Sequence, residues 1–179
     1  MMHDKNLVIY KSVTGFTKQY AEMIAQELDC PALELKNVSA KTLSGYETVI
    51  FGGRFHAGSI DGLKKARKLF EASTAKQLVV FATGATPNTA QDIITDAWNN
   101  NFTPDELKNT PHFYMQAGLR YERMPFFDKI MMKAFVAMMK HKKDKNAYEK
   151  SLESAISASY DISAREYIRP LLACLKREQ

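Results

Sequence analysis

The chain has 179 residues, of which 45% are hydrophobic and 11% aromatic, and this composition suits a single domain over residues 1–179 with a sizeable core. Its distant cysteines, Cys30 and Cys174, lack a CxxC pair or a neighbouring histidine, so we expect buried thiols, no disulfide framework and no metal site. The net charge of +5 would suit nucleic acid, anionic lipid or an acidic protein, but the excess comes from lysines between 129 and 145, and we expect no nucleic-acid partner.

In chain order, short apolar runs alternate with helical patterns. The first helical pattern follows residues 6–10 and ends at Asp29-Cys30-Pro31, because proline disfavours a helical residue before it. Leu63, Ala66, Leu69 and Phe70 mark a second helix, and Thr103-Pro104-Asp105-Glu106 has the signature of a helix start. Such alternation predicts an α/β fold with a parallel sheet and right-handed crossovers. The runs predicted as strands are 6–10, 32–35, 48–51, 78–82 and 112–117.

Membrane and export signals are not predicted. The first apolar run, Leu7–Tyr10, is too short for the core of a signal peptide. No uninterrupted apolar stretch approaches the roughly 18 to 20 residues that cross a bilayer. We therefore expect a cytoplasmic protein.

The last sixty residues contain two predicted helices. The first runs from about 126 to 140, carries four of the nine methionines, and leaves only a narrow polar strip. It either covers one face of the sheet or, with its lysines, forms an adaptable interface for a partner or an anionic membrane over 126–145. A polar stretch from 142 to 159 follows. The last helix spans about 163 to 176, where Pro170 either kinks or divides it.

Each strong strand is followed by a loop that contains glycine. These are Thr14-Gly15, Gly52-Gly53 with Gly58, and Thr83-Gly84. Ligands of open α/β sheets bind outside the carboxyl ends of the strands, so we expect these loops to converge on one site. The first offers hydroxyl groups at 12, 14 and 17 before the free N–H groups of a helix start, which suits a phosphate. Neither GxxxxGK[ST] nor GxGxxG is present, which disfavours nucleoside triphosphates and dinucleotides.

Residues 8–17, Val-Ile-Tyr-Lys-Ser-Val-Thr-Gly-Phe-Thr, resemble the FMN-binding signature of flavodoxins, and the likeness extends from about Lys5 to Gly118. The resemblance implies a doubly wound, five-stranded parallel sheet of order 2-1-3-4-5 with helices on both faces. It also implies an FMN-binding electron carrier that serves a separate redox partner protein. The residues implied for the phosphate are Ser12, Val13, Thr14, Gly15, Phe16 and Thr17; those beside one side of the flavin ring are Gly53, Arg54, Phe55, His56, Ala57 and Gly58; and those at its other edge are Thr83, Gly84, Ala85, Thr86 and Asn88.

Some of these residues have more than one reading. Phe55 either packs in the core or stacks on the flavin, and His56 is a loop residue, a flavin contact or a proton donor. Arg54 is either solvated or favours the anionic reduced flavin. No catalytic residue is assigned. Flavodoxin carriers are acidic, whereas this chain is basic, so docking on their usual reductases is not expected.

A second resemblance offers an alternative from another class. Residues 117–121 and 127–131 are similar to the bacterial menaquinone-dependent protoporphyrinogen oxidase family, which implies a membrane-associated FMN oxidoreductase that approaches a quinone or a large planar substrate. A flavin-free, phosphate-accepting receiver module is disfavoured, because Tyr10-Lys11-Ser12 supplies no acidic pocket.

Overall fold

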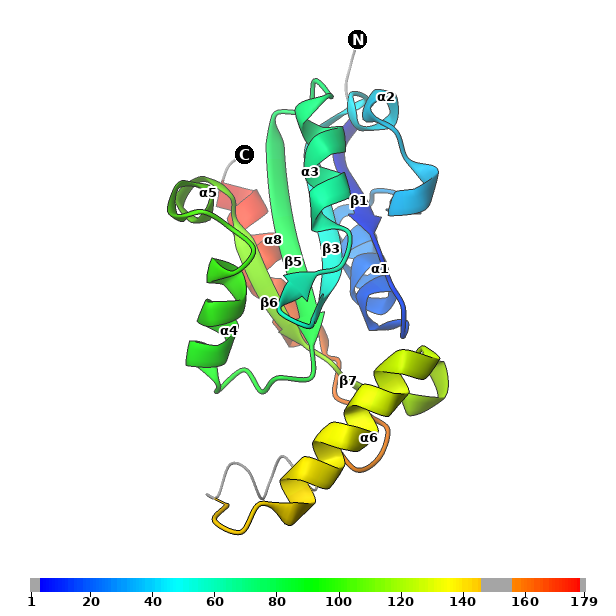
Figure 1. Cartoon of the computed structure of the whole chain (residues 1–179). Coiled ribbons are helices and arrows are strands. Elements are labelled where there is room, and N and C mark those ends of the chain that lie inside the picture. The colour runs from blue at the N-terminus through cyan, green and yellow to red at the C-terminus, as the bar shows by residue number, and fades with distance from the viewer. Residues whose placement is uncertain (1–3, 146–155, 178–179) are drawn as a thin grey trace.

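Five parallel strands form the centre of the protein, shown in Figure 1 as a computed structural model that describes residues 4–145 and 156–177. The strand order β2-β1-β3-β5-β6 confirms the predicted doubly wound, flavodoxin-like arrangement. Ladders such as Val8 beside Ala32 and Ile50 fix the register. The strands are β1 (Asp4–Tyr10), β2 (Ala32–Glu34), β3 (Tyr46–His56), β5 (Gln77–Gly84) and β6 (His112–Gln116).

Helices cover both faces of the sheet, as expected from the alternating pattern. On one face α1 (Phe16–Leu28) and α8 (Arg169–Arg177) pack on strand side chains such as Val8, Ile50 and Phe81, and Tyr20 and Leu171 are fully buried there. On the other face lie α2 (Ala40–Leu43), α3 (Leu63–Glu71) and α4 (Gln91–Asn99), which bury Leu43, Leu63 and Trp98. The core therefore consists of two apolar layers separated by the sheet.

The third predicted strand is longer than expected. The sequence placed its end at Phe51, before Gly52-Gly53, yet β3 continues to His56 and returns as β4 (Ser59–Ile60). The two glycines sit inside the strand because of close packing: a Cβ on Gly52 would lie 2.1 Å from the ring of Phe81. Arg54, Phe55 and His56 thus belong to the paired β3–β4 hairpin.

Two helices were missing from the sequence-based expectation. Helix α2 has only four residues, and α4 buries just Ile94 and Trp98, so neither produces a strong apolar pattern. The helix start at Thr103 is confirmed, because α5 (Pro104–Asn109) begins there with a reciprocal capping box between Thr103 and Glu106. The cysteines are partly buried, not fully as expected; burial raises the pKa of the Cys30 thiol to about 11, so it stays protonated at neutral pH.

Residues 118–145 and 156–161, called the arm below, lie beyond the sheet. After β7 (Gly118–Leu119) and a 3-10 turn at Tyr121–Arg123, α6 (Phe126–His141) crosses beneath the carboxyl ends of the strands (Figure 1). It packs through Met139 on Leu119 and Ile156, and β8 (Tyr160–Asp161) pairs with β7.

The exposure of α6 corrects one of the two readings of this helix. It does not cover a sheet face: its only buried residue is Met139, while Phe126 and Phe127 are 71% and 77% exposed. The predicted helix at 163–176 is divided, because a 3-10 turn (Arg165–Ile168) precedes α8 and places Pro170 in its first turn. Of the polar stretch 142–159, residues 146–155 lie outside the described part. No helix in the described ranges is long and apolar enough to cross a membrane.

Candidate functional site

Residues 12–17, the phosphate loop, connect β1 to α1 at the carboxyl edge of the sheet. Gly15 is the N-cap of α1 and has a φ of +97°, a backbone conformation that favours glycine. No side chain caps the helix, and its first turn contains no acidic residue. The first N–H groups of α1 are therefore available to an anion, which the helix dipole also favours.

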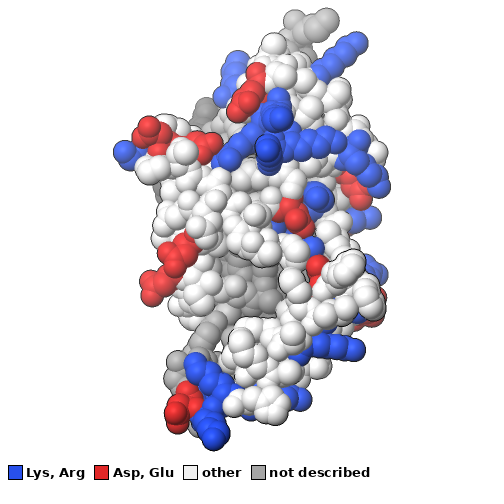
Figure 2. Space-filling view, viewed as in Figure 1, with Lys and Arg blue, Asp and Glu red and all other residues white. Residues whose placement is uncertain are grey.

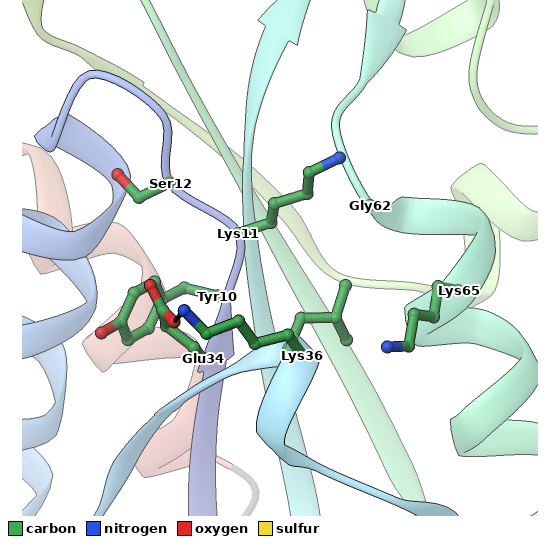
Figure 3. A pocket seen from close by; sticks show the side chains of 8 residues that line it. Tyr10, Lys11, Ser12, Glu34, Lys36, Gly62 and Lys65 are labelled. Atoms are coloured by element: carbon green, nitrogen blue, oxygen red, sulfur yellow. Dashed lines mark ion pairs between the residues drawn. The ribbon is translucent and has the colours of Figure 1, made fainter. Parts of the chain in front are cut away.

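The hydroxyl groups of the phosphate loop are not equivalent. Ser12 Oγ is shielded from solvent and has no hydrogen-bond partner among the described residues. Figure 3 shows its side chain turned away from the neighbouring lysines and toward α1. Thr17 Oγ1 instead lies 2.8 Å from Thr83 Oγ1, and both residues are buried, so this pair ties the phosphate loop to the end of β5. A buried hydroxyl without a partner calls for an acceptor or donor from a ligand.

A cavity of about 280 Å³, the α6 cavity, lies between these strand ends and the arm. It brings together residues from all three predicted loops and adds a wall that the loops alone would not provide. The predicted residues that line it are Thr14, Arg54, Phe55, His56, Ala85 and Thr86. The others are Gly118, Leu119, Arg120, Met124, Asp128, Met131 and Met132, so the arm supplies an apolar, methionine-rich side opposite the loops.

The remaining predicted site residues lie around this cavity without lining it. Phe16 and Thr83 are buried in the core, and Asn88 is held by a hydrogen bond from its N–H to Gln116 Oε1. Ala57 and Gly58 form the exposed tip of the β3–β4 hairpin. The other six, which also do not line it, are Ser12, Val13, Gly15, Thr17, Gly53 and Gly84.

Phe55 packs against other aromatic rings and also reaches the α6 cavity. Its ring lies 5.0 Å from that of Trp98 and 5.8 Å from that of Tyr114, measured between centroids, so it belongs to an aromatic cluster on the α4 face. It also lines the α6 cavity. Hydrogen bonding supports the opposite rim, because Tyr114 donates to the carbonyl of Thr86 at 2.8 Å. Phe55 and Thr86, on opposite rims of the cavity, are therefore both held by neighbouring side chains.

The sequence did not single out Asp128, which organises the charged side of the cavity. Its Oδ2 lies 2.9 Å from Arg54 Nη1 and its Oδ1 lies 3.2 Å from His56 Nε2, while Arg54 Nε donates to Asp61 at 2.6 Å. The side chains of Arg54 and Asp128 are only 17% and 14% exposed. Asp128 is the one acidic residue between 123 and 143, a signal that could have marked it. It holds the start of α6 against β3.

Arg120 forms a second bridge from the arm to the phosphate loop. Its guanidinium lies 4.0 Å from the centre of the Phe16 ring and donates to the carbonyl of Thr14 at 3.3 Å. It also donates to Gln19 Oε1 at 2.9 Å and to Asp161 Oδ2 at 2.6 Å. Burial alone would raise the pKa of the Asp161 carboxyl, but hydrogen bonds from Ser163 and Arg120 outweigh it and hold that pKa below its usual range.

This lowered pKa predicts an acid-sensitive contribution to stability. Since the carboxylate is favoured in the folded state, its contribution is present above the unfolded pKa of about 3.9 and is lost as the pH falls through the folded value. We expect Asp161→Asn to lower the melting temperature at pH 7, with a difference from wild type that shrinks below about pH 3. Thermal melts between pH 2.5 and 7 measure this. A difference that does not change with pH would mean that the ion pair contributes nothing.

A larger cavity of about 410 Å³ adjoins the other side of the phosphate loop (Figure 3). Three lysines line it, Lys11, Lys36 and Lys65, and its one carboxylate, Glu34, forms an ion pair with Lys36. Lys65 lies in the first turn of α3 and points across the cavity. These ammonium groups make the potential positive at the edge where the phosphate loop begins.

A family model described as the flavodoxin domain matches residues 7–146, which include all three loops and α6. The chain belongs to the flavodoxin family. No curated protein matches this flavodoxin-domain chain.

Solved flavodoxin structures resemble this flavodoxin-domain protein at low sequence identity. An archaeal flavodoxin is 17% identical, with 63% of this chain and 84% of that chain covered and a TM-score of 0.41. Flavodoxin 2 from Bacillus cereus is 19% identical over 76% of this chain and 99% of that chain, with a TM-score of 0.41. Flavodoxin 1 from the same organism is 17% identical over 78% and 100%, with a TM-score of 0.42.

Proposed function

We propose that this protein binds FMN noncovalently in the cytoplasm and transfers electrons to or from a separate redox protein. The observation that carries the proposal is the juxtaposition of the phosphate loop, with its unpartnered Ser12 hydroxyl, and the α6 cavity at the ends of β3 and β5. The flavodoxin domain supports the same assignment. Bound FMN would supply the electron-transfer chemistry at its ring.

The chain's own residues would divide the work of binding. Ser12 and the first N–H groups of α1 suit the phosphate, and Gly15 allows the backbone to approach it. Phe55 suits one side of the ring, and the turn at Ala85 and Thr86, where the Thr86 carbonyl accepts a hydrogen bond from Tyr114, suits the other. Arg54, His56 and Asp128 would set the charge beside it.

Two measurements on the purified protein test the proposal. We expect a yellow protein that releases FMN and not FAD on denaturation, and apoprotein that binds added FMN in a calorimetric titration. A colourless protein that fails to bind added FMN would remove the basis for the proposal and for its alternative below.

The charged cluster of Arg54, His56 and Asp128 predicts that two substitutions within it shift the reduction potential of bound flavin in opposite directions. Reduced flavin carries additional negative charge, so Arg54→Gln should lower the reduction potential of the bound flavin and Asp128→Asn should raise it. Each shift should be on the order of tens of millivolts. Photoreduction with reference dyes reports both signs.

The two variants control for each other. Both break the same 2.9 Å contact between Arg54 and Asp128, so a loss of structure alone would move both potentials in one direction. Arg67→Gln serves as a remote control, since Arg67 pairs with Glu106 outside the cavity. Shifts of equal sign in the first two variants would place the cluster away from the ring.

The partner we propose has an acidic face. Lysine and arginine side chains gather over α3 and at the far end of α6 (Figure 2), so the surface differs from that of an acidic carrier. Opposite charges steer two proteins together and make their association sensitive to salt.

A specific observation favours a second candidate, a membrane-associated FMN oxidoreductase. Helix α6 closes one side of the cavity with Met131 and Met132, and its outer side exposes Phe126, Phe127 and Met138. An apolar wall beside a flavin suits a quinone or a large planar substrate, and an exposed apolar helix flanked by lysines suits an anionic membrane. Binding to anionic vesicles would separate this candidate from the carrier.

A further inference from the structure

Two arginines of the arm lie at the start of α1, outside the signature that the sequence provides for phosphate. A Cβ placed on Gly15 would lie 2.8 Å from Arg120 Nη1 and 3.0 Å from Arg123 Nη1. Both guanidinium groups are therefore in van der Waals reach of the N-cap of α1. The loop itself, Ser12–Thr17, contains no charged side chain.

The two arginines have different surroundings. Arg120 is bonded to Thr14, Gln19 and Asp161, and Asp161 compensates its charge. In the described ranges, no carboxylate lies within ion-pair distance of Arg123. Its neighbour Glu122 instead accepts a hydrogen bond from Ser159 Oγ at 2.7 Å. Arg123 thus brings to Gly15 a guanidinium that no described carboxylate contacts within ion-pair distance, while Arg120 donates to the carbonyl of Thr14 beside it.

The groups at this point fit a phosphate dianion better than a neutral ligand. A phosphate monoester carries about −1.5 to −2 charges at neutral pH. The buried Ser12 hydroxyl lacks a partner, whereas the Thr17 hydroxyl is already paired with Thr83. With one hydroxyl occupied, a guanidinium is the strongest remaining group, because its hydrogen bonds to phosphate are charge-assisted and often bidentate.

We propose that Arg123 binds the phosphate of FMN directly and that Arg120 positions the phosphate loop for it. Phosphate recognition in this chain then relies on a cation supplied by the C-terminal arm and not on the loop alone. The inference rests on the proposed function, since it names a further ligand for the same cofactor. It also explains why the 3-10 turn at Tyr121–Arg123 is held against α1.

Calorimetric titration of apoprotein with FMN and with riboflavin tests this inference, because riboflavin lacks the phosphate. We expect Arg123→Gln to weaken FMN binding by about tenfold to a hundredfold and to leave riboflavin binding unchanged. The salt dependence of FMN affinity should also become smaller in this variant. Arg123→Lys should give an intermediate FMN affinity, since lysine keeps the positive charge but lacks the planar N–H donors with which a guanidinium binds phosphate bidentately.

Arg165→Gln is the matched control. Arg165 also lies beside α1 but pairs with Glu27 and Gln26, away from the phosphate loop, so this variant should bind both flavins like wild type. If wild type binds FMN and Arg123→Gln binds it within twofold, the inference is overturned and the proposed function stands. An equal loss for riboflavin would also overturn it. If wild type binds no FMN, the proposed function and the inference both fail.

Discussion

Gly15→Val should reduce FMN affinity by about a hundredfold or more while leaving the protein folded. Gly15 caps α1 with a φ of +97°, where a β-branched residue is strained. The added side chain would also displace the guanidinium groups of Arg120 and Arg123, which lie within 3.0 Å of the new Cβ. The phosphate would then lose both the helix N–H groups and the nearby charge.

Gly58→Val gives a matched control for this backbone effect. Gly58 also has a positive φ, +80°, but nothing lies within 4 Å of a Cβ placed there, and it sits at the exposed tip of the β3–β4 hairpin. We expect it to cost about 1 to 2 kcal/mol of stability through the backbone. Because Gly58 does not line the α6 cavity, this variant should bind FMN like wild type, and a loss of affinity would instead support the placement of Gly58 beside the flavin ring that the resemblance implies. Circular dichroism and calorimetry on both variants measure the two effects. Equal FMN affinities in wild type and Gly15→Val would place the phosphate elsewhere.

The parallel sheet could be predicted because local patterns indicate it, and the family resemblance supplied the order of its strands. Short β-rich runs separated by helical periodicity indicate parallel strands, and the glycine-containing loops mark their carboxyl ends. The structure confirms the strand order and brings Thr14, Arg54 and Thr86 to one cavity. The family resemblance then supplied the ligand, which no local pattern specifies.

The errors arose where tertiary packing overrides a local signal. Gly52 and Gly53 were read as the end of a strand, but they lie within β3, because Phe81 and Asp61 occupy the space of their missing side chains. The Thr17 hydroxyl, which stays a predicted phosphate ligand, also lies against Thr83, a contact across 66 positions that no local signal indicates. The local conformational preferences of glycine and threonine are the same whether or not a distant residue packs against them, so the sequence does not reveal these contacts.

The arm was the least predictable part of the site. Its apolar composition suggested either a sheet cover or an interface, and the choice depends on how Met139 packs on Ile156. The contacts of Arg120 with Thr14 and of Asp128 with Arg54 join residues more than 70 positions apart. Such contacts leave no periodic trace in one sequence, so the charged cluster became visible only in the structure.

The same arm determines the second large expected effect, binding to anionic vesicles. Five large apolar side chains of α6 are exposed, and they lie on the helix that carries the excess of lysines: Phe126, Phe127, Ile130, Met131 and Met138. If α6 is an interfacial element, wild-type protein should co-sediment with vesicles that contain anionic lipid at low salt. Because each lysine near the surface contributes about 1 kcal/mol, binding should weaken sharply as the salt concentration rises.

Replacing Lys140, Lys142 and Lys143 by glutamate should lower vesicle affinity by more than a hundredfold without changing FMN binding. All three residues are exposed and lie outside the phosphate loop and the α6 cavity. The matched control replaces Lys64, Lys65 and Lys68 of α3, which are also exposed and change the net charge by the same amount. We expect this control to keep most of the vesicle binding, since α3 lies on a sheet face away from α6.

A substitution on the apolar side of α6 distinguishes insertion into the bilayer from electrostatic attraction to its surface alone. Phe127→Ser removes a ring that is 77% exposed, so it should leave the melting temperature unchanged and still weaken vesicle binding by roughly tenfold to a hundredfold, the transfer free energy of one large apolar side chain. Co-sedimentation that salt reduces but Phe127→Ser does not change would indicate attraction to the lipid surface without insertion. Wild-type protein that stays in the supernatant at low salt would exclude the membrane-associated enzyme, and the exposed face of α6 would then belong to a protein partner of the carrier.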